Sequence, residues 1–489
     1  MPMIATGTFR LVLLLRLFQI SCTIVIRVND VGLQEAANRT RQWLTMAGPH
    51  LALPDMRQVY VNPFTAGEVI VRNITVDRFV PPQIRFQLND QSALQMFTHS
   101  GYAQVGANWE LRSEFLRVLD VPLMGTVRIQ MTGLISAIEM KNILPDKLEV
   151  SNCVARIRDI RMNLHGSIAA DVLQLFRASF VPRIRRKLEQ DYCTLMEKFW
   201  MPWVEAQVSQ FPSNLTFSRS NPEVTLIQSL KEIVLSRKQV DLELRSDLIW
   251  NGNLIDSVNA SLHSNDSDKP STRMITIFVE EVTIQKLLNA AHNASLFINT
   301  VESPFLQTQC DVLCIGTLMP ELSEAMPNSS LVAQVSALTA PLISLYEGQA
   351  VVFVNASLNI LAQSAINKAS GILVSISVDT EFTLELAIHK GRVRGSAKTL
   401  RTRAVLIDSQ IGMISQKAVD LLVEMSAPFV EDAIRLLLRR GLPTTSLFQF
   451  PTRNELLVVE EKFLRLEADI DFPVAYYYSP VAPKIRSSP

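Results

Sequence analysis

The side chains with the most reactive chemistry in this sequence are its five cysteines, Cys22, Cys153, Cys193, Cys310 and Cys314. A thiol can form a disulfide, bind zinc or act as a nucleophile, and its compartment and spacing decide among these. If a leader were removed near Cys22 in an oxidising compartment, an even number would remain. The simplest pairing is then Cys153 with Cys193 and Cys310 with Cys314. Zinc is the competing interpretation, but a C-x3-C pair without a second close pair or nearby histidines is a poor zinc pattern.

Catalytic and nucleotide-binding motifs are absent from the sequence. It contains no G-x-S-x-G, Walker loop, G-x-G-x-x-G or H-E-x-x-H. Ser167 follows His165 and could be a nucleophile, but a helix N-cap is the favoured interpretation of a serine at that place. We therefore expect no enzyme activity, no cofactor and no metal. The histidines are scattered: His50, His99, His165, His263, His292 and His389.

The first 22 residues have the pattern of a cleaved secretory signal peptide. Arg10 precedes an apolar run, LVLLLRLFQI, and the small residues Ser21 and Cys22 follow it. A membrane anchor is the alternative, but the run is shorter than the ~20 residues that a membrane span needs. The sequence thus predicts a secreted, extracellular protein. Eight N-x-[ST] sequons agree with glycosylation there: Asn38, Asn73, Asn214, Asn259, Asn265, Asn293, Asn328 and Asn355.

The charge pattern argues against nucleic acid as a partner. Residues 23–250 carry 26 Lys and Arg against 23 Asp and Glu, and residues 251–489 carry 19 against 24. Neither half is basic enough to bind a phosphate backbone through charge alone.

Period-two alternation of apolar and polar residues predicts strands over 126–133, 240–247, 372–379 and 464–472, as in antiparallel sheets with one buried face. Apolar residues at three- and four-residue steps predict helices over 31–46, 168–206, 282–293 and 416–443. Pro182 and Pro428 fall inside the two long helices and predict bends in both.

The order of these elements is repeated in the two halves: a short helix, several strands and a long helix. We expect a signal peptide over 1–22, one domain over 23–249, a linker over 250–273, a second domain over 274–472 and a flexible tail over 473–489. The segment 250–273 holds two sequons, five serines and a proline, although 250–260 could still be strand.

A helix over 168–206 would be about 58 Å long, which suits a long curved sheet wrapped around it better than a compact globule. A Cys153–Cys193 bridge would tie that helix to the strand before it. A gap between helix and sheet could then stay open and take up apolar ligands. The alternative is a filled core, because apolar residues at helical spacing are more often core.

These features resemble one protein family. The resemblance is carried by three features: the segment TIVIRVNDVGLQEAANRTRQWL after the leader, a pair of cysteines 40 residues apart around an amphipathic helix, and the segment QKAVDLLVEMSAPFVEDAIRLLLRRGLP near the C-terminus. They are similar to the family that includes bactericidal/permeability-increasing protein, lipopolysaccharide-binding protein and the phospholipid and cholesteryl ester transfer proteins. The resemblance covers essentially the whole chain after residue 22 and rests on layout and cysteine spacing.

The resemblance implies an α+β fold with two elongated barrels, each a twisted antiparallel sheet around a long bent helix. A central sheet would join them in a boomerang-shaped monomer, and Cys153 and Cys193 match the family's disulfide. Each barrel would hold a phospholipid or neutral lipid between its short helix, its long helix and its sheet. The candidate lipid-binding residues are Leu33, Ala36, Ala37, Trp43, Val172, Leu173, Phe176, Phe180, Ile184, Leu188, Leu287, Leu288, Val419, Leu422, Phe429 and Ile434.

The sequence departs from the family's pattern in two places. Endotoxin-binding members have a strongly cationic N-terminal domain, whereas the corresponding half is nearly neutral here. The one dense basic run is Arg183, Arg185, Arg186 and Lys187, and a solvated helix face is favoured over a phosphate site for it. Cys310 and Cys314 are outside the shared pattern and predict a small local loop, with free thiols as the alternative.

We therefore expect a secreted lipid-binding or lipid-transfer protein that docks transiently on membranes or lipoproteins. Innate-immune recognition of bacterial lipopolysaccharide or another microbial lipid is the alternative. A secreted lipid hydrolase would need a nucleophile, a base and an oxyanion hole. A structural or adhesive protein with solid cores would carry no lipid.

Overall fold

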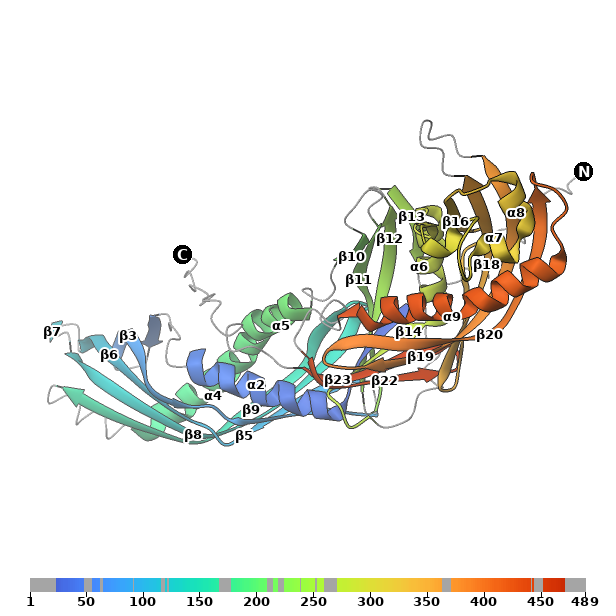
Figure 1. Ribbon diagram of the computed structural model, residues 1–489. Coiled ribbons are helices and arrows are strands. Elements are labelled where there is room, and N and C mark those ends of the chain that lie inside the picture. The colour runs from blue at the N-terminus through green and yellow to red at the C-terminus, as the bar shows by residue number, and fades with distance from the viewer. Residues whose placement is uncertain are drawn as a thin grey trace, which may run out of the picture. The chain divides into compact units, whose positions relative to one another are not determined.

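The computed structural model describes residues 23–47, 55–61, 65–90, 92–115, 119–120, 123–166, 177–208, 214–218, 224–237, 239–250, 253–258, 271–362, 371–440, 442–443 and 452–470. They form a mixed α+β structure that is mostly sheet, in agreement with the expected class. The chain divides into two compact units (Figure 1). The N-terminal unit contains Val28–Gln210 and Glu232–Asp241, and the C-terminal unit contains Phe211–Lys231, Leu242–Asp471 and the described residues 23–27.

The N-terminal unit is built on an antiparallel sheet, eight-stranded within the described ranges, in the order β2-β3-β6-β8-β5-β4, with β7 beside β6 and β9 beside β8. Its longest strands, β8 and β9, have 22 and 20 residues. The strands are β2 (Met56–Val61), β3 (Thr65–Val80), β4 (Gln83–Leu88), β5 (Leu94–His99), β6 (Tyr102–Phe115), β7 (Leu119–Asp120), β8 (Leu123–Leu144) and β9 (Lys147–Gly166).

Gly133 interrupts the ladder between β8 and β9. The pairing passes from Thr132↔Asp159 to Leu134↔Ile157, and the amide of Gly133 donates instead to Gly101 O at 3.0 Å. Gly133 has φ +71°, and a Cβ there would lie 2.8 Å from the Cβ of Arg158. Only glycine fits both the left-handed backbone and this close approach.

Helices pack against this sheet (Figure 1). Helix α2 (Asp30–Ala47) packs on β4, and α4 (Arg177–Leu195) and α5 (Met201–Val208) pack on β9. Between α4 and α5 lies a π-helical turn, η2 (Met196–Trp200). Leu33, Ala37 and Thr40 are buried, so one stripe of α2 faces inward, as the periodicity predicted.

A second sheet, most of it in the C-terminal unit and eight-stranded in the part of the chain that the structure describes, has the order β10-β11-β12-β1-β14-β23-β22, with β13 beside β12. Strand β1 (Thr23–Val28), the first among the described residues, therefore lies between strands more than 200 residues away. The others are β10 (Asn214–Ser218), β11 (Val224–Leu235), β12 (Val240–Trp250), β13 (Asn253–Val258), β14 (Ile275–Glu280), β22 (Thr452–Glu460) and β23 (Phe463–Ile470).

The C-terminal unit also has an antiparallel sheet, seven-stranded among the described residues, in the order β15-β16-β18-β19-β20-β21, with β17 beside β18. These strands are β15 (Ile298–Val301), β16 (Leu331–Ala337), β17 (Leu342–Tyr346), β18 (Gln349–Ala362), β19 (Ile372–Ile388), β20 (Arg392–Ser409) and β21 (Leu442–Pro443). Helix α9 packs along β20, and α6 packs on β17. The helices are α6 (Glu281–Asn293), η3 (Pro304–Leu306), α7 (Ile315–Leu318), α8 (Pro320–Ala325) and α9 (Gln416–Arg440).

The expected strands 126–133, 240–247 and 372–379 lie within β8, β12 and β19, and 464–472 corresponds to β23 as far as Ile470. The expected helices correspond to α2, the α4–α5 run, α6 and α9, but α9 ends at Arg440 and Leu442–Pro443 form β21. Pro182 and Pro428 both lie inside continuous helices. The expected signal (1–22) and tail (473–489) lie outside the described residues, as does 167–176, where the long helix was expected to begin. Strand β13 occupies part of the segment expected to be a linker, 250–273. No helix in the described ranges is long and apolar enough to span a membrane.

Candidate functional site

The long helix of the N-terminal unit is held to strand β9 at its C-terminal half. A disulfide joins Cys153 in β9 to Cys193 in α4, with 5.8 Å between the Cα atoms. One turn earlier, Glu189 Oε1 accepts a hydrogen bond of 2.8 Å from the amide of Ile157. Ile157 pairs with Leu134 of β8, next to the position where Gly133 has no partner in β9, so the carboxylate binds the strand beside that interruption.

A chain of hydroxyl groups continues this attachment across the sheet. Tyr192 OH lies 3.1 Å from Ser136 Oγ in β8, and Ser136 Oγ lies 2.7 Å from Thr98 Oγ1 in β5. Burial raises the pKa of the Tyr192 phenol, and the hydrogen bond to Ser136 opposes that rise. The three hydroxyls are neutral at physiological pH and bind α4 to two strands.

The first half of α4 packs on a buried apolar cluster. Trp109, Val127 and Met162 are buried together on the sheet, and Val181 and Ile184 of α4 pack against them. The indole Nε1 of Trp109 donates to Thr126 O at 3.3 Å, so its polar atom has an acceptor.

The end of the helical run makes different contacts. The ring of Trp200 stacks on Phe86 of β4, with 6.2 Å between centroids and 16° between planes. Gln34 of α2 donates to Phe86 O at 3.4 Å, so α2, β4 and η2 meet at this point. Trp200 is 6% exposed, and Met196 and Met201 beside it are also buried.

The C-terminal unit repeats the carboxylate attachment. Glu431 Oε1 of α9 accepts a hydrogen bond of 2.8 Å from the amide of Thr399 in β20. The ladder between β19 and β20 shifts register at that point, so this amide too lies at an irregularity of the sheet. In both units 32 residues separate the glutamate from its amide partner. The amide of Thr399 lowers the pKa of the Glu431 carboxyl.

The short helices repeat a contact as well. Gln34 is the fifth residue of α2, and Gln285 is the fifth residue of α6. Gln285 donates to Pro341 O at 2.9 Å and accepts from the amide of Ile343 at 3.0 Å. Each glutamine therefore makes a hydrogen bond to the main chain of the strand that its helix covers, and Gln285 makes a second one to Pro341, just before that strand.

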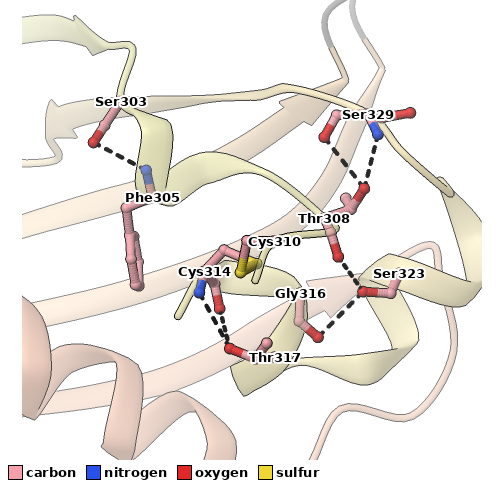
Figure 2. The surroundings of a disulfide bond; sticks show 9 residues. All are labelled: Ser303, Phe305, Thr308, Cys310, Cys314, Gly316, Thr317, Ser323 and Ser329. Atoms are coloured by element: carbon pink, nitrogen blue, oxygen red, sulfur yellow. Dashed lines mark hydrogen bonds between the residues drawn. A yellow bond between two sulfur atoms is a disulfide. The ribbon is translucent and has the colours of Figure 1, made fainter. Parts of the chain in front are cut away.

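The Cys310–Cys314 disulfide closes a small loop in the C-terminal unit (Figure 2). Cys314 is buried, and its amide and carbonyl both bond the Thr317 hydroxyl, at 3.2 and 2.7 Å. Ser323 Oγ donates to Gly316 O at 3.2 Å and also to Thr308 O. The loop is therefore rigid at its base, as the local role expected for this pair requires.

The core under α9 is large and apolar. Val419 and Leu422 are buried in a cluster with Ile315 and Met319, among others. The first two turns of α9 therefore pack on a buried apolar cluster.

The candidate lipid-binding residues lie in three kinds of place. Leu33 and Ala37 are buried on the inner stripe of α2, whereas Ala36 is exposed on its outer face. Half-buried positions on the other helices are Ile184, Leu188, Leu287, Leu288 and Ile434. Outside the description are Val172, Leu173 and Phe176, together with the side chains of Trp43, Phe180 and Phe429.

The surface residues singled out from the sequence are mostly exposed. Arg186 and Lys187 are exposed, Lys187 with an ion pair of 2.7 Å to Asp191, as expected of a solvated helix face; Arg185 is half-buried. The exposed sequon residues within the described ranges are Asn38, Asn73, Asn293 and Asn328. Asn355 is half-buried in β18 and donates to Asp379 Oδ1 at 2.6 Å. Asn259 and Asn265 lie outside the described residues, as does the side chain of Asn214.

Sequence reasoning missed the residues that attach the helices, Glu189, Tyr192, Glu431 and Trp200. Tyr192 and Trp200 continue the helical spacing from Leu188 and Met196 and could have been found there. The glutamates carried no signal, because a surface carboxylate has the same local pattern. No group of His, Cys, Asp and Glu among the described residues is arranged to hold a metal ion.

Comparisons with known proteins agree with this architecture. A family profile described as "LBP / BPI / CETP family, C-terminal domain" matches residues 218–472. Bactericidal permeability-increasing protein of Rattus norvegicus is 21% identical over 471 residues, which cover 91% of this chain and 93% of that protein. The solved structure "Crystal structure of lipopolysaccharide binding protein" shares the fold, with a TM-score of 0.53, 14% identity, and coverage of 93% of this chain and 100% of that one. Because the family profile matches more than half of the residues, the chain belongs to the LBP / BPI / CETP family, as the resemblance of its sequence indicated.

Proposed function

We propose that this chain is a secreted lipid-binding and lipid-transfer protein that holds phospholipid or neutral lipid between its helices and sheets. The observation that carries the proposal is the repeated construction of the two units. In each, a glutamate of a long amphipathic helix binds a main-chain amide at an irregularity of a long strand. Such polar attachments keep a helix in place while the apolar side chains beside them exchange contacts with an acyl chain.

The proposed fold is the elongated one implied by the family. Each unit would form a barrel of twisted sheet around its long helix, and a central sheet would join the barrels in a boomerang-shaped monomer. We retain the proposed domains of 23–249 and 274–472, although the contacts assign β1 and residues 211–231 to the C-terminal unit. The proposed lining is the buried and half-buried part of the candidate set, such as Leu33, Ala37 and Leu188 in the first unit and Leu287 and Ile434 in the second.

The driving force would be removal of acyl chains from water. Each buried CH2 contributes about 0.8 kcal/mol, so a chain of ~16 carbons gains on the order of 12 kcal/mol before ordering costs. Head groups would stay near water, because burying an unpaired charge is costly. Transfer would then need transient docking on a membrane or lipoprotein surface and no cofactor.

Secretion and glycosylation belong to the same proposal. Two disulfides suit an oxidising compartment. The exposed sequons Asn38, Asn73, Asn293 and Asn328 offer accessible acceptors, whereas the amide of Asn355 is already paired inside a strand.

Native mass spectrometry of the secreted, deglycosylated protein tests lipid binding, with lipid extraction from the same sample. We expect one or two phospholipid masses to be released on denaturation. A bare protein mass, together with no uptake from labelled phosphatidylcholine vesicles, would contradict the proposal and favour a structural or adhesive protein with solid cores.

Recognition of bacterial lipopolysaccharide is the second candidate, because the names of two relatives point to bacterial or lipopolysaccharide targets. The charge of the chain speaks against it, since residues 23–250 carry 26 basic against 23 acidic side chains. We expect phosphatidylcholine vesicles to compete fully with labelled lipopolysaccharide. Tight, salt-sensitive binding of lipopolysaccharide that phosphatidylcholine does not displace would reverse the order of the candidates.

A further inference from the structure

Trp200 buries a hydrogen-bond donor that has no acceptor among the described residues. Its side chain is 6% exposed, and its indole Nε1 has no hydrogen-bond partner. A buried unpaired donor is destabilising, and native proteins keep few of them. Trp109, the other tryptophan whose burial is described, is equally buried but donates to Thr126 O at 3.3 Å.

The surroundings of Trp200 hold its ring in place without satisfying its nitrogen. The ring stacks on Phe86, and Gln34 binds the main chain of Phe86, so the indole lies between helix and sheet. Trp200 ends the π-helical turn η2, and such turns occur frequently at functional sites. Met196 and Met201 flank it, and methionine side chains adapt readily to a changing neighbour.

Other unpaired nitrogens in the N-terminal unit are less informative. The Nε atoms of Arg41 and Arg185 also lack an acceptor among the described residues, but both side chains are only half-buried. Water can therefore reach part of each guanidinium group. The indole of Trp200 has a single nitrogen, and that nitrogen is buried.

The acceptor that fits this nitrogen is a neutral oxygen attached to an apolar chain. A phosphate would bring a full negative charge beside a buried ring that stacks on Phe86, at a large desolvation cost. An ester carbonyl brings an acceptor and no charge, and it lies where an acyl chain meets the rest of a lipid. A hydrogen bond from the indole N–H to that carbonyl would then fix the depth at which the lipid binds.

We infer that the indole N–H of Trp200 donates a hydrogen bond to an ester carbonyl of a bound acyl lipid, so that the N-terminal unit prefers ester-linked to ether-linked lipids. The inference rests on the proposed lipid binding and makes it specific, since apolar packing alone would not distinguish the two linkages.

A competition between two lipids tests this directly. The secreted protein is offered equimolar diacyl and dialkyl phosphatidylcholine of matched chain length in mixed vesicles, and native mass spectrometry gives the ratio bound. The ratio does not depend on how much of the protein is loaded. One neutral hydrogen bond in a buried site corresponds to about a tenfold preference for the diacyl lipid.

Trp200→Phe keeps the aromatic stack and removes the donor, so it should bind both lipids about equally at this site. Trp109→Phe is the matched control and should keep the preference of the unaltered protein. If the C-terminal unit also carries a lipid, only one of the two bound lipids should change. In lipid-free protein, Trp200→Phe should unfold at the same urea concentration as the parent or a higher one, whereas Trp109→Phe should unfold at a lower one.

The outcomes separate this inference from the proposed function. An unaltered protein that takes up neither lipid would overturn both. Uptake with a ratio that Trp200→Phe leaves unchanged, as when a bound water satisfies the indole, would overturn the ester contact alone. Lipid-free Trp200→Phe protein that is destabilised as much as Trp109→Phe would show an acceptor within the protein and would also overturn it.

Discussion

The Cys153–Cys193 disulfide offers the sharpest test of how the long helix of the N-terminal unit is held. We consider the double substitution of Cys153→Ser and Cys193→Ser, which leaves neither partner of this pair as a free thiol. Glu189, Tyr192 and Ile184 still attach α4 to the sheet, so the folded unit should keep its helix in place. The loss should therefore come mainly from the unfolded chain, which is no longer cross-linked.

The size of the effect follows from the length of chain that each disulfide closes. The two cysteines are 40 residues apart, and in the chain-entropy model a ring of that size is worth about 4 kcal/mol. Cys310 and Cys314 are 4 residues apart, and the same model gives about 2 kcal/mol for their ring. The second pair, replaced by serines, is the control: it has the same chemistry and a smaller ring.

Hydrogen exchange during urea titration, followed by mass spectrometry of peptides from β9 and β18, reports on each unit separately. With a urea dependence of about 3 kcal/mol per molar, the first pair should lower the midpoint of its unit by roughly 1.3 M, and the control by about half as much in its own unit. Secreted yield should fall more for the first pair. Equal shifts for the two pairs, or normal yield and stability without Cys153–Cys193, would show that the larger ring does not stabilise its unit as proposed.

Three further predictions follow from single contacts. Glu431→Gln should lower the urea midpoint of the C-terminal unit at pH 7 and have little effect near pH 3. The folded pKa of the Glu431 carboxyl lies below its ordinary value of 4.5. The carboxylate therefore stabilises the folded unit fully above pH 4.5, and this stabilisation is lost as pH falls through the folded pKa. An equal effect of the substitution at both pH values would contradict this. Tyr192→Phe should lower the free energy of unfolding by about 1 kcal/mol, because it removes the hydrogen bond to Ser136. The folded pKa of this phenol is raised, so in the parent protein it should titrate later than free tyrosine in an ultraviolet titration, and this late phase should be missing from the variant. The stability linked to the raised pKa is lost as pH rises above about 10, through the folded pKa. Gly133→Ala should cost at least ~1–3 kcal/mol in thermal unfolding, since alanine would need φ +71° and meet Arg158; an unchanged Tm would count against the strain.

Local periodicity was sufficient to predict the longer helices and some of the strands. Alternation over 372–379 and 464–472 identified strands within β19 and β23, and the apolar stripe over 416–443 identified α9. These patterns are properties of neighbouring residues, so they can be seen in the sequence without knowledge of the fold. The pairing of Cys310 with Cys314 could be predicted for the same reason, since the two cysteines are close in the sequence.

The sequence predicted only in part which residues of a helix face the interior. Ala36 and Ala37 are adjacent small residues on α2, and both fit a lipid-facing pattern. In the structure Ala37 is buried and Ala36 is exposed, because α2 lies on β4 with one stripe inward. The direction of that stripe is set by the packing partner and not by the residues alone.

The class of fold, some of the strands, the longer helices, the cysteine pairs and the resemblance to the family could all be predicted from the sequence. Which strands are neighbours depends on the tertiary structure: β1 lies between β12 and β14, and ladder hydrogen bonds join main-chain groups that are alike in all residues except proline. The tertiary structure also decided that Glu189 and Glu431 meet amides at breaks in those ladders. Whether a buried donor has an acceptor depends on atoms brought together from distant segments, and so the unpaired indole of Trp200 could be recognised only in the folded chain.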